Sequence, residues 1–554
     1  MAHNKNKAKY FQSRFRTLEK ERQSFIPHYK DLSEFIQPRR GRFFVTNRNV
    51  GGPRHSKIIN SKATQAHRSA RAGLFAGVMS PARPWFALRV RDNPDLMEFG
   101  PVKIWLADVE ERMRAIFNKS NLYSMAPVML GELLLFSTGC MTHADDFKDV
   151  ARFYTHTVGS YMIAQDARGV VTTLVRKYEM TTLQLVEAFG LSSVSQNVKD
   201  QYDQGNYDAW HSVVHFIEPN PDVDPSKAGS QFKAFRSVKY QPSELQVNVN
   251  GKFLSRRGFD RFPGYIPRWE ITGEDIYGTD CPGMTSLGDV KGLQVKEKRL
   301  AQGIDKVVNP PLKGPASIRN VPVESLPGGL TIYDAGAGTE KLEPLYLVQP
   351  NVQELVADIN RTERRIDEAF YVDLFFAISN MEGIQPKNQM ELLHRNEERL
   401  LQLGPVLERV HGEFLDGMVD RTFDQMIAAE LIPPAPKELQ GAQLKIEYIS
   451  SLAMAQRAVA TGSIDRLFGF AGGLRGMGYD QINDKLDADQ ALDNYSSLIG
   501  VPPRLVVPDD AVAEVRQERE QERQEQLQQV AQVQAAAGMK DEAAAVKDIG
   551  EANV

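Results

Sequence analysis

The residues of this chain that could do metal chemistry are two histidines, His211 and His215, four positions apart in the stretch HSVVHFIEP. On a helix, that spacing with a glutamate after the first histidine is a zinc-binding motif of metalloproteases. Here Ser212 follows the first histidine, and the pattern of the stretch predicts a strand. We therefore expect a histidine pair that is hydrogen-bonded to its surroundings, and no metal site.

The sequence lacks common motifs of phosphate-binding and hydrolytic enzymes. Neither GxxxxGK(S/T), which would form an ATP-binding P-loop, nor GxSxG, which would hold a nucleophilic serine, is present. Gly328-Gly329 and the run DAGAGTEK at 334–341 lack the context of a strand followed by a helix, so we expect turns there. Asp145 and Asp146 are expected to be exposed and without a catalytic role. These patterns predict a chain that is no enzyme and needs no cofactor; an enzyme whose site leaves no motif is one alternative.

The composition is that of an ordinary globular protein. The 554 residues are 42% hydrophobic and 25% charged, and the length suggests about three or four domains. A net charge of −4 does not indicate nucleic-acid binding, although charge could be segregated by region. Cys140 and Cys281 are the only cysteines, which excludes a disulfide framework and a CxxC zinc site and suits a reducing cytoplasm.

Neither a signal peptide nor a membrane span is expected. The N-terminus, MAHNKNKAKYFQSRFR, is basic but has no apolar core of the kind that a signal peptide needs. The best apolar run, Val128–Phe136, is far shorter than the roughly 20 residues of a membrane-spanning helix. We expect a soluble chain that is neither secreted nor embedded in a membrane.

The sequence pattern of residues 1–285, the first half of the chain, predicts a mixed body of helices and strands. Helices are expected at four places: 9–36, 60–79, 105–118 and 123–139. From residue 147 the pattern becomes rich in strands, with a turn at Asp166–Gly169. One short helix interrupts these strands, with Thr181 as its N-cap and Gly190 at its end. The fold class predicted for the whole chain is α+β and predominantly helical.

Two helices with a compact module between them follow. A helix is predicted over Ser286–Val308, and NPPLKGP ends it because proline cannot continue a helix. Residues 309–348 are rich in proline and glycine, which predicts turns and short strands. Apolar residues at helical spacing then predict a second helix over Pro350–Tyr371. Two helices that enter and leave one small module must lie antiparallel, so this region is expected to form a stalk with a tip.

A long predicted helix, residues 389–436, contains its own breaker, Gly404-Pro405. Apolar residues keep helical spacing on both sides, and proline inside a straight helix costs roughly 3 kcal/mol. We predict one bent helix with its kink at Gly404 and Pro405; a helical hairpin with its turn there is the alternative. Unbent, about 43 residues of helix would reach about 64 Å, which suits a subunit of a ring better than a compact monomer.

The remaining segments carry weaker patterns. Residues 372–388 are read as an irregular linker and residues 437–505 as a further helical region, with IEYISSLAMAQRA among its helices. The tail, residues 506–554, consists of strong helix formers but has almost no apolar face in its middle. Two interpretations of the tail therefore remain: a frayed segment, or a helix that packs against the same helix of other copies.

Four segments form a recognisable series: LFAGVMSPARPWFAL, RGVVTTLVRKYEMTTLQLVEAFG, GEDIYGTDCPGMTSLGDVKGLQ and LGPVLERVHGEFLDGMVDRTFDQM. In this order they resemble the portal, or head-to-tail connecting, proteins of short-tailed bacteriophages. The resemblance covers roughly Phe15 to Pro508. Each motif is short, but four in the right order around a turn-rich module between two helices are specific.

The resemblance implies a ring, usually a dodecamer, with the portal architecture of wing, stem, clip, tunnel loop and crown. On this chain it implies the following segments: wing 1–285, stem helices 286–308 and 349–371, clip 309–348, tunnel loop 372–388, kinked wing helix 389–436, crown 437–505, and a helical barrel or disordered tail 506–554. The weakly apolar tail departs from the expected barrel.

The function implied by the resemblance is a conduit for double-stranded DNA during packaging and ejection of a phage genome. The expected partners are further copies of the chain, the terminase large subunit, a tail adaptor or head-completion protein, the major capsid and scaffolding proteins, and internal core proteins. The expected location is the virion, at one capsid vertex, after assembly in the host cytoplasm and without a membrane. The alternative is a cytosolic helical scaffold or adaptor that never contacts DNA.

Few cations are expected in such a channel, because a ring repeats each one and dense lysine and arginine would hold the phosphates. The candidate channel residues are Lys387 and Asn388 in the loop and Arg361, Arg364 and Arg365 on the second stalk helix. For each cation, an ordinary solvated side chain or a salt bridge between subunits is the alternative.

Overall fold

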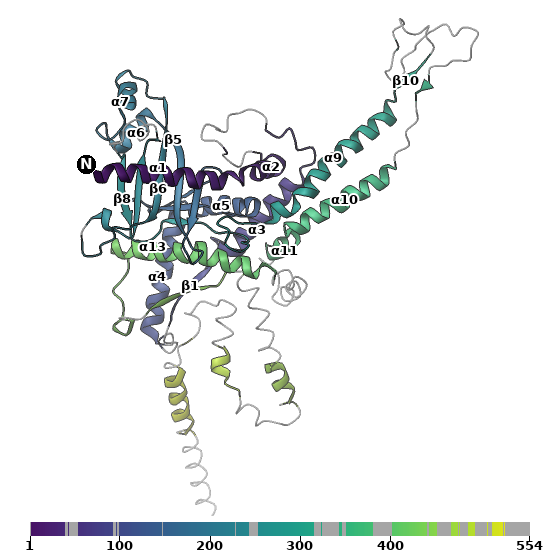
Figure 1. Ribbon diagram of the computed structural model, residues 1–554. Coiled ribbons are helices and arrows are strands. Elements are labelled where there is room, and N and C mark those ends of the chain that lie inside the picture. The colour runs from purple at the N-terminus through teal and green to yellow at the C-terminus, as the bar shows by residue number, and fades with distance from the viewer. Residues whose placement is uncertain are drawn as a thin grey trace, which may run out of the picture. The chain divides into compact units, whose positions relative to one another are not determined.

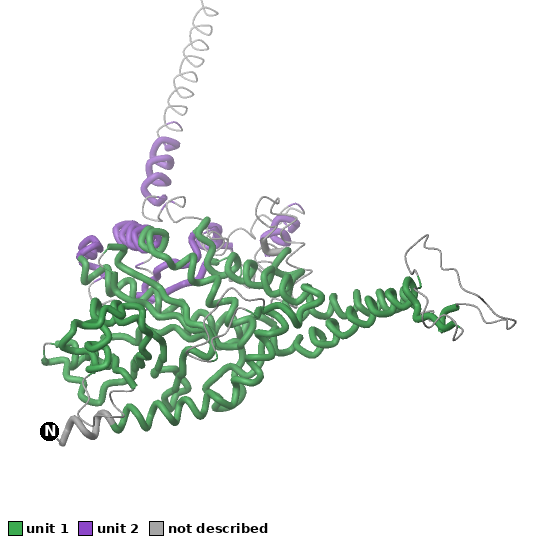
Figure 2. Tube along the Cα trace, turned by 90° about the horizontal axis from the view of Figure 1, so that it is seen from above, with its two compact units in different colours: residues 1–83, 115–429, 450–456 green, residues 84–114, 430–449, 457–554 purple. Residues whose placement is uncertain are grey.

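The computed structural model divides the chain into two compact units (Figure 2). Unit 1 comprises residues 1–83, 115–429 and 450–456, and unit 2 comprises residues 84–114, 430–449 and 457–554. The structure describes the following residues: 2–38, 43, 54–91, 96, 99–146, 148–227, 229–242, 253–314, 323, 343–345, 351–379, 402–439, 443–450, 452, 467–474, 476, 486–492, 507, 512–524 and 526.

The body of unit 1 contains a five-stranded antiparallel sheet of order β4-β5-β6-β7-β8 (Figure 1). The strands are β4 Tyr161–Gln165, β5 Val171–Thr181, β6 Trp210–Pro219, β7 Phe235–Tyr240 and β8 Ser255–Phe259. Helix α1, Ala2–Gln23, packs Phe11 and Leu18 onto one face of this sheet. Alternate strand residues point to that face and complete the apolar cluster: Met162, Ala164, Val175, Val214, Phe216, Val238 and Tyr240.

The opposite face of the sheet carries two separate apolar clusters. One contains Leu174 and Ile217, and the other joins Val213 to helices α6, Thr182–Phe189, and α7, Gln196–Asp203. The sequence prediction for α6 is confirmed. Thr181 forms a capping box with Gln184, and Gly190 ends the helix with a φ of 78° that favours glycine.

Further helices and a small sheet complete the body of unit 1. The helices are α2 Ile26–Ile36, α3 Lys62–Met79 and α5 Leu122–Phe136; the sheet, of order β3-β2-β9, contains β2 Met141–Asp146, β3 Val150–Thr155 and β9 Gly264–Tyr265. The predicted single helix over residues 9–36 is wrong, because α1 and α2 are separated at Ser24 and Phe25. Pro27 explains the break: it has no N–H for Gln23, and its ring would clash with the carbonyl of that residue.

The predicted stalk helices are confirmed as α9, Pro282–Val308, and α10, Val352–Ala369, which lie side by side (Figure 1). Helix α9 begins at Pro282 and not at Ser286, because proline is well suited to the first turn of a helix. Beyond them, β10, Leu312–Lys313, pairs antiparallel with β11, Glu343–Pro344. Most of the predicted clip, residues 309–348, lies outside the described part of the chain.

Helix α11, Val372–Ser379, occupies the first part of the segment that was expected to be an irregular linker. The expectation is wrong for these residues, because Val372, Leu374 and Phe375 are buried on one side of a helix. Phe375 lies directly against Gly73 of α3, where any larger residue would clash with it.

Residues 402–428 form a continuous helix with a π-helical segment, His411–Leu415, ahead of α13, Asp416–Ala428. Gly404 and Pro405 both lie in its helical part, but residues 389–401 are not among those described. The kink at Gly404 and Pro405 therefore stays a prediction. The helix stops at Ala428 and does not continue to residue 436; Glu430 adopts a φ of 57°, and prolines follow.

Unit 2 contains a two-stranded antiparallel ladder between β1, Phe86–Val90, and β12, Leu444–Tyr448. The helical prediction is wrong at β12, where apolar and charged residues alternate with the period of a strand. Helix α4, Gly100–Lys119, contributes its residues up to Arg114 to this unit, and Trp105 Nε1 donates to Pro433 O at 3.0 Å. Helical residues also occur at 467–474, 488–492 and 512–524, within the predicted helical region and tail.

Candidate functional site at the α9–α10 helix pair

Helices α9 and α10 are held in antiparallel register by ion pairs. Lys296 Nζ lies 2.7 Å from Asp358 Oδ2 and donates to Thr362 Oγ1 at 2.8 Å. Arg365 Nη2 lies 2.8 Å from Asp289 Oδ1. Since residue numbers rise along α9 as their partners' numbers fall along α10, these contacts fix one alignment of the pair.

The middle parts of both helices are tied to the segment that precedes α3. Asn60 Nδ2 donates to Glu297 Oε1 of α9 at 2.7 Å and to Glu363 Oε1 of α10 at 2.8 Å. Gln294 Oε1 accepts from the backbone N–H groups of Ile59 and Asn60 at 2.6 and 2.8 Å. Glu363 interrupts the apolar stripe of α10 in the sequence, and its bond to Asn60 is the reason for a carboxylate at that position.

The buried side of α10 consists of Ile359, Thr362 and Ile366, which recur at helical spacing. Arg361 and Arg364 are exposed on the side of the helix away from this stripe. Among the described residues, neither arginine side chain has a hydrogen bond or an ion pair. Two of the candidate channel cations are therefore available on one outward face of α10.

The other candidate channel residues have different positions. Arg365 is half-exposed and bound to Asp289 of the same chain, so an intrachain ion pair accounts for it. Lys387 and Asn388 lie outside the described residues, and their proposed place in a channel stays a prediction. Lys296, which sequence reasoning did not single out, is the cation that joins the two helices.

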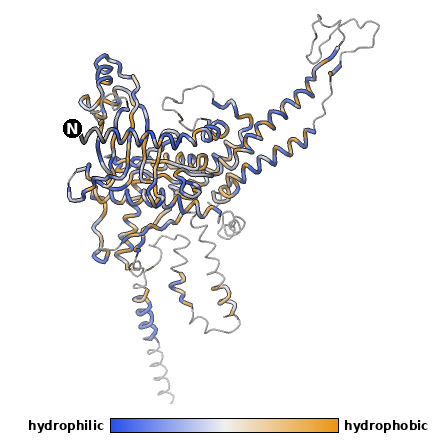
Figure 3. Tube along the Cα trace, in the orientation of Figure 1, coloured by the Kyte–Doolittle hydropathy of each residue, from blue (hydrophilic) through white to orange (hydrophobic). Residues whose placement is uncertain are grey.

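The outer halves of the two helices are open to solvent in the single chain. In the described structure, no residue of α9 after Gln294 is buried, and none of α10 before Ile359. Six apolar side chains in these halves are between 36% and 78% exposed: Val295, Ile304, Val307, Val308, Leu355 and Val356. Figure 3 shows apolar positions interspersed with polar ones along both helices. Six partly exposed apolar side chains therefore lie along the outer halves of the two helices.

Charge on the helix pair is mixed. The hydrogen bond from Lys296 lowers the pKa of the Asp358 carboxyl below its usual value, so this acid remains ionised at neutral pH. The exposed residues of α10 include acids such as Glu354 and Glu368 beside Arg361 and Arg364. The exposed side of α10 therefore carries both signs of charge.

A cavity of about 370 Å³ lies where α9 begins and α10 ends, lined by residues that include Trp269, Glu270, Asp280, Cys281 and Tyr371. Burial raises the pKa of the Cys281 thiol to about 12, so it is not a nucleophile at neutral pH. No group of three or more metal-ligating side chains occurs among the described residues. This cavity therefore has no arrangement that we can assign to catalysis.

The histidines and acids considered from the sequence have structural partners. His211 Nε2 lies 3.0 Å from Thr182 Oγ1, and His215 Nε2 lies 2.8 Å from Ser237 Oγ, which confirms the expected hydrogen-bonded pair. Asp145 is exposed as expected and bonds to Arg421 at 3.0 Å. The same expectation is wrong for Asp146, which is half-buried because its Oδ1 accepts from the backbone N–H of Lys148 at 2.8 Å. Gly328, Gly329 and residues 334–341 lie outside the described part of the chain.

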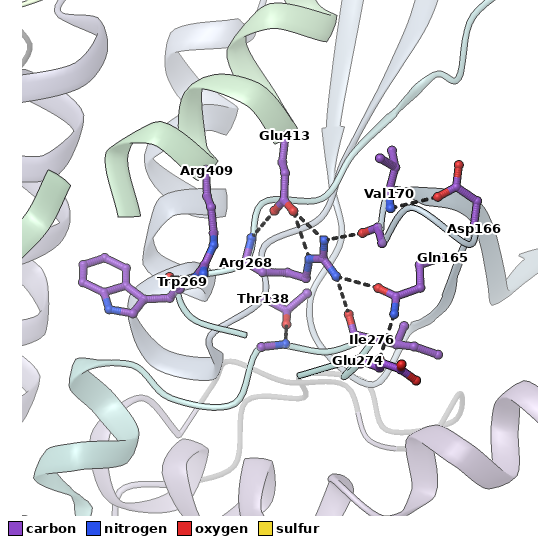
Figure 4. A network of polar contacts seen from close by, with 12 residues as sticks. Thr138, Gln165, Asp166, Val170, Arg268, Trp269, Glu274, Ile276, Arg409 and Glu413 are labelled. Atoms are coloured by element: carbon purple, nitrogen blue, oxygen red, sulfur yellow. Dashed lines mark hydrogen bonds and ion pairs between the residues drawn. The ribbon is translucent and has the colours of Figure 1, made fainter. Parts of the chain in front are cut away.

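A buried polar network at the base of the helix pair was not foreseen (Figure 4). Arg268, whose side chain is 3% exposed, binds Glu413 of the π-helical segment and also donates to Gln165 Oε1 and the carbonyls of Gly169 and Ile276. Arg409, one turn before Glu413, donates to the carbonyl of Trp269 at 3.0 Å. No sequence pattern signals the pairing of Arg268 with Glu413 or of Arg409 with Trp269, because the residues of these pairs lie 145 and 140 positions apart.

None of the helices in the described ranges is both long and apolar enough to cross a bilayer. This finding is consistent with the absence of a long apolar run in the sequence.

Known proteins match nearly the whole chain. The family model for bacteriophage head to tail connecting protein matches residues 8–507. The portal protein of Salmonella phage epsilon15 is 43% identical over 502 residues, with 91% of this chain and 89% of that protein covered. The probable portal protein of Bordetella phage BPP-1 is 41% identical over 508 residues, covering 92% and 90%. A chain of the neck of an empty gene transfer agent particle matches at a TM-score of 0.36 and 12% identity, over 85% of this chain and 98% of that chain.

Proposed function

The chain belongs to the bacteriophage head to tail connecting protein family and has a portal role, and we propose that it performs this role as a closed ring of identical copies. In the proposed ring, usually a dodecamer in this family, the α9–α10 pair of each copy packs against the pairs of its two neighbours. The ring occupies one vertex of the capsid and conducts double-stranded DNA during packaging and ejection.

The observation that carries this proposal is the set of six exposed apolar side chains on the outer halves of α9 and α10. A helix pair that extends from its body exposes such residues to water unless another surface covers them. In a ring, each pair has a neighbour on either side, so the apolar sides are covered and a polar side is left for the lumen. In a ring closed by heterologous contacts, each copy touches two neighbours, so both apolar sides of its helix pair are covered.

In the proposed ring, the exposed side of α10 that carries Arg361 and Arg364 faces the channel. Rotational symmetry repeats both arginines around the axis, which gives the DNA a ring of phosphate contacts without strong attachment at any one point. Arg365 contributes to the helix pair through Asp289 and not to the DNA contact. Lys387 and Asn388 are proposed as further channel residues. Only the resemblance of the chain to the portal family supports this assignment.

The proposed partners follow the segments of the chain. Residues 309–348, at the outer end of the helix pair, dock the terminase large subunit and then the tail adaptor or head-completion protein. The body formed by the first half of the chain contacts the major capsid and scaffolding proteins, and internal core proteins bind at the opposite end. The names of the relatives describe structural components, and we assign no catalytic step to the chain.

Negative-stain imaging of the purified full-length protein tests the ring. We expect particles with a central hole and one dominant rotational symmetry. A monomer at every concentration and salt condition would refute the proposal. The remaining hypothesis would then be a helical scaffold or adaptor protein that does not contact DNA.

The docking assignment has a separate test. Deletion of 315–342 retains the paired ends β10 and β11, so rings are expected to form while binding of the purified terminase large subunit is lost. Rings that still bind the motor after this deletion would contradict the assignment.

A further inference from the structure

The two-stranded ladder of unit 2 has two outer edges, because β1 and β12 pair only with each other among the described strands. At one end of the ladder, Ile449 N donates to Trp85 O at 3.0 Å. Bonded and non-bonded pairs alternate along an antiparallel ladder. Along the register from that end, Leu88 and Ile446 form a non-bonded pair, so their backbone groups point away from the partner strand.

The outer edge of β1 is closed by a side chain. Glu110, a buried residue of α4, accepts from the outward N–H of Leu88 through Oε1 at 2.7 Å. The edge of the five-stranded sheet at β4 is closed in a similar way, because Arg22 Nη1 donates to the carbonyl of Tyr161 at 3.2 Å. Unpaired groups on an edge strand are a template for pairing with another chain, and such contacts prevent that pairing.

The outer edge of β12 is open. In the described part of the chain, the N–H and C=O groups of Ile446 have no hydrogen-bond partner. Leu444 and Ile446 are half-buried, although the residues opposite them on β1, Val90 and Leu88, are buried. The apolar contacts of the ladder thus extend over β1 and stop at β12. One further strand beside β12 would pair these backbone groups and cover both half-buried side chains.

Charges on the opposite face of β12 indicate what a third strand should carry. Lys445 is exposed and lies directly opposite Arg89, and like charges in that arrangement are unfavourable. Arg89 Nε binds Glu447 Oε2 at 2.9 Å, whereas the Lys445 ammonium has no ion pair or hydrogen bond within the described ranges. A carboxylate on a third strand beside Lys445 would balance this charge. A segment in which apolar and acidic residues alternate therefore fits both faces of the ladder.

A second copy of the chain fits this edge poorly. A head-to-tail contact would pair β12 with the outer edge of β1, which Glu110 closes. Two β12 strands could pair antiparallel about Ile446, with Lys445 opposite Glu447, but that contact has two-fold symmetry and joins copies in pairs. The exclusion by symmetry rests on the proposed ring, whose copies are related by rotation about a single axis.

We propose that β12, Leu444–Tyr448, receives an extended segment of another protein as a third strand, and that apolar and acidic residues alternate along this segment. Apolar side chains of the segment contact Leu444 and Ile446, and an acidic side chain pairs with Lys445. The residue opposite Ile446 is apolar, and its N–H and C=O bond to those of Ile446. The edge belongs to unit 2 and includes no residue of the α9–α10 pair.

Fluorescence anisotropy of the full-length protein with a labelled peptide of alternating valine and glutamate tests the edge. Methylation of every valine nitrogen removes the donors that face β12 and is expected to weaken binding at least about tenfold. The matched control is methylation of every glutamate nitrogen, which leaves those donors intact. No binding of the unmodified peptide, or equal binding of the two methylated peptides, would overturn the proposal. Because the probe is a peptide, rings that fail to form would refute the proposed function without deciding this test.

The variant Lys445→Glu tests the charge of the segment. This substitution of an exposed residue is expected to weaken binding of the valine–glutamate peptide about tenfold and to strengthen binding of a valine–lysine peptide. Lys437→Glu is the control, since Lys437 is also exposed and belongs to the same unit, and it is expected to change neither affinity. Equal losses in the two variants, or tighter binding of the valine–lysine peptide by the unaltered protein, would each overturn the acidic assignment.

Discussion

Glu413 binds both the guanidinium and the backbone N–H of Arg268. Its Oε1 accepts from Arg268 Nε at 3.1 Å, and its Oε2 accepts from Arg268 N at 2.8 Å (Figure 4). Glu413 lies in the π-helical segment His411–Leu415, and Arg268 also binds the turn between β4 and β5. One buried arginine therefore connects the long helix to the sheet, and the π-helical segment is where the helix presents the carboxylate.

The first prediction concerns this pair. Glu413→Gln is expected to lower the free energy of unfolding by about 3 kcal/mol, because it leaves the charge of Arg268 buried without a counter-charge. Thermal and urea unfolding of the purified protein measure the loss. Arg168→Gln is the control: the Arg168–Asp166 pair is at the nearby turn, but its arginine is largely exposed, so little change is expected. Equal stabilities of the two variants would show that the Arg268 network is not important for the fold.

The second prediction concerns the alignment of the helix pair. Arg365→Asp places two carboxylates beside each other at Asp289 and is expected to destabilise the pair, by about 1 kcal/mol at this half-exposed site. The exchanged double variant Arg365→Asp with Asp289→Arg is expected to recover most of that loss. A double-mutant cycle on unfolding free energies gives the coupling. No recovery in the exchanged variant would mean that this ion pair does not align α9 and α10.

The third prediction separates the exposed arginines from the paired one. Arg361→Gln combined with Arg364→Gln is expected to leave the melting temperature and the ring unchanged, since neither side chain has a bonding partner among the described residues. Retention of packaged DNA in assembled phage particles is expected to fall, and the salt dependence of DNA binding by rings to weaken. Unchanged DNA retention together with unchanged salt dependence would remove both residues from the channel.

The fourth prediction concerns the exposed apolar side chains. Ile304→Asp is expected to prevent ring formation, because it places a charge in the proposed contact between copies, while the chain itself keeps its fold. Mass photometry and circular dichroism distinguish the two effects. Ile304→Val is the matched control and is expected to form rings. Rings of normal size in Ile304→Asp would exclude this part of α9 from the interface.

The fifth prediction is a pH dependence of stability. Burial, followed by the positive charge of Arg421, lowers the pKa of His143 from 6.5 to about 3. Because the folded state disfavours the charged imidazole, the contribution of His143 is complete above pH 6.5 and decreases as the pH falls from 6.5 towards 3. At pH 5 the loss from this residue is about 2 kcal/mol.

His143→Phe tests this assignment. Stability at pH 7.5 is expected to fall, since the bond between His143 Nδ1 and the Tyr265 hydroxyl at 2.8 Å is lost. The further loss between pH 7.5 and pH 5 is expected to be smaller than in the unaltered protein, though not absent, because burial also lowers the pKa of His156 and of His215. An identical pH profile for both proteins would rule out His143 as a source of the acid sensitivity.

Elements with a strong local signal were predicted well from the sequence. Thr181 and Gly190 mark the two ends of α6 through contacts within a few residues, so nothing distant is needed to place them. Helix α10 has apolar residues at helical spacing, and prolines bound the module between α9 and α10. The two exposed arginines of α10 could also be named as candidates, because a helical pattern determines which residues share a face.

Elements whose partners are distant in the chain were predicted poorly. Strand β12 pairs with β1, from the other end of the chain, and α11 is buried against Gly73 of α3. Arg176, His215 and Lys239 likewise become neighbours only through strand register. Propensity over a short window cannot represent contacts of this kind.

The sequence by itself determined that two helices flank a segment rich in proline and glycine, the order of the family motifs and the identity of the candidate channel cations, because periodicity, composition and motif order act along the chain. Only the tertiary structure decided which cations are exposed and which are bound: Arg365 meets Asp289, whereas Arg361 and Arg364 face outward. It also decided that Glu413 and Arg268 meet, since long-range packing, and not local preference, sets the partner of a buried charge.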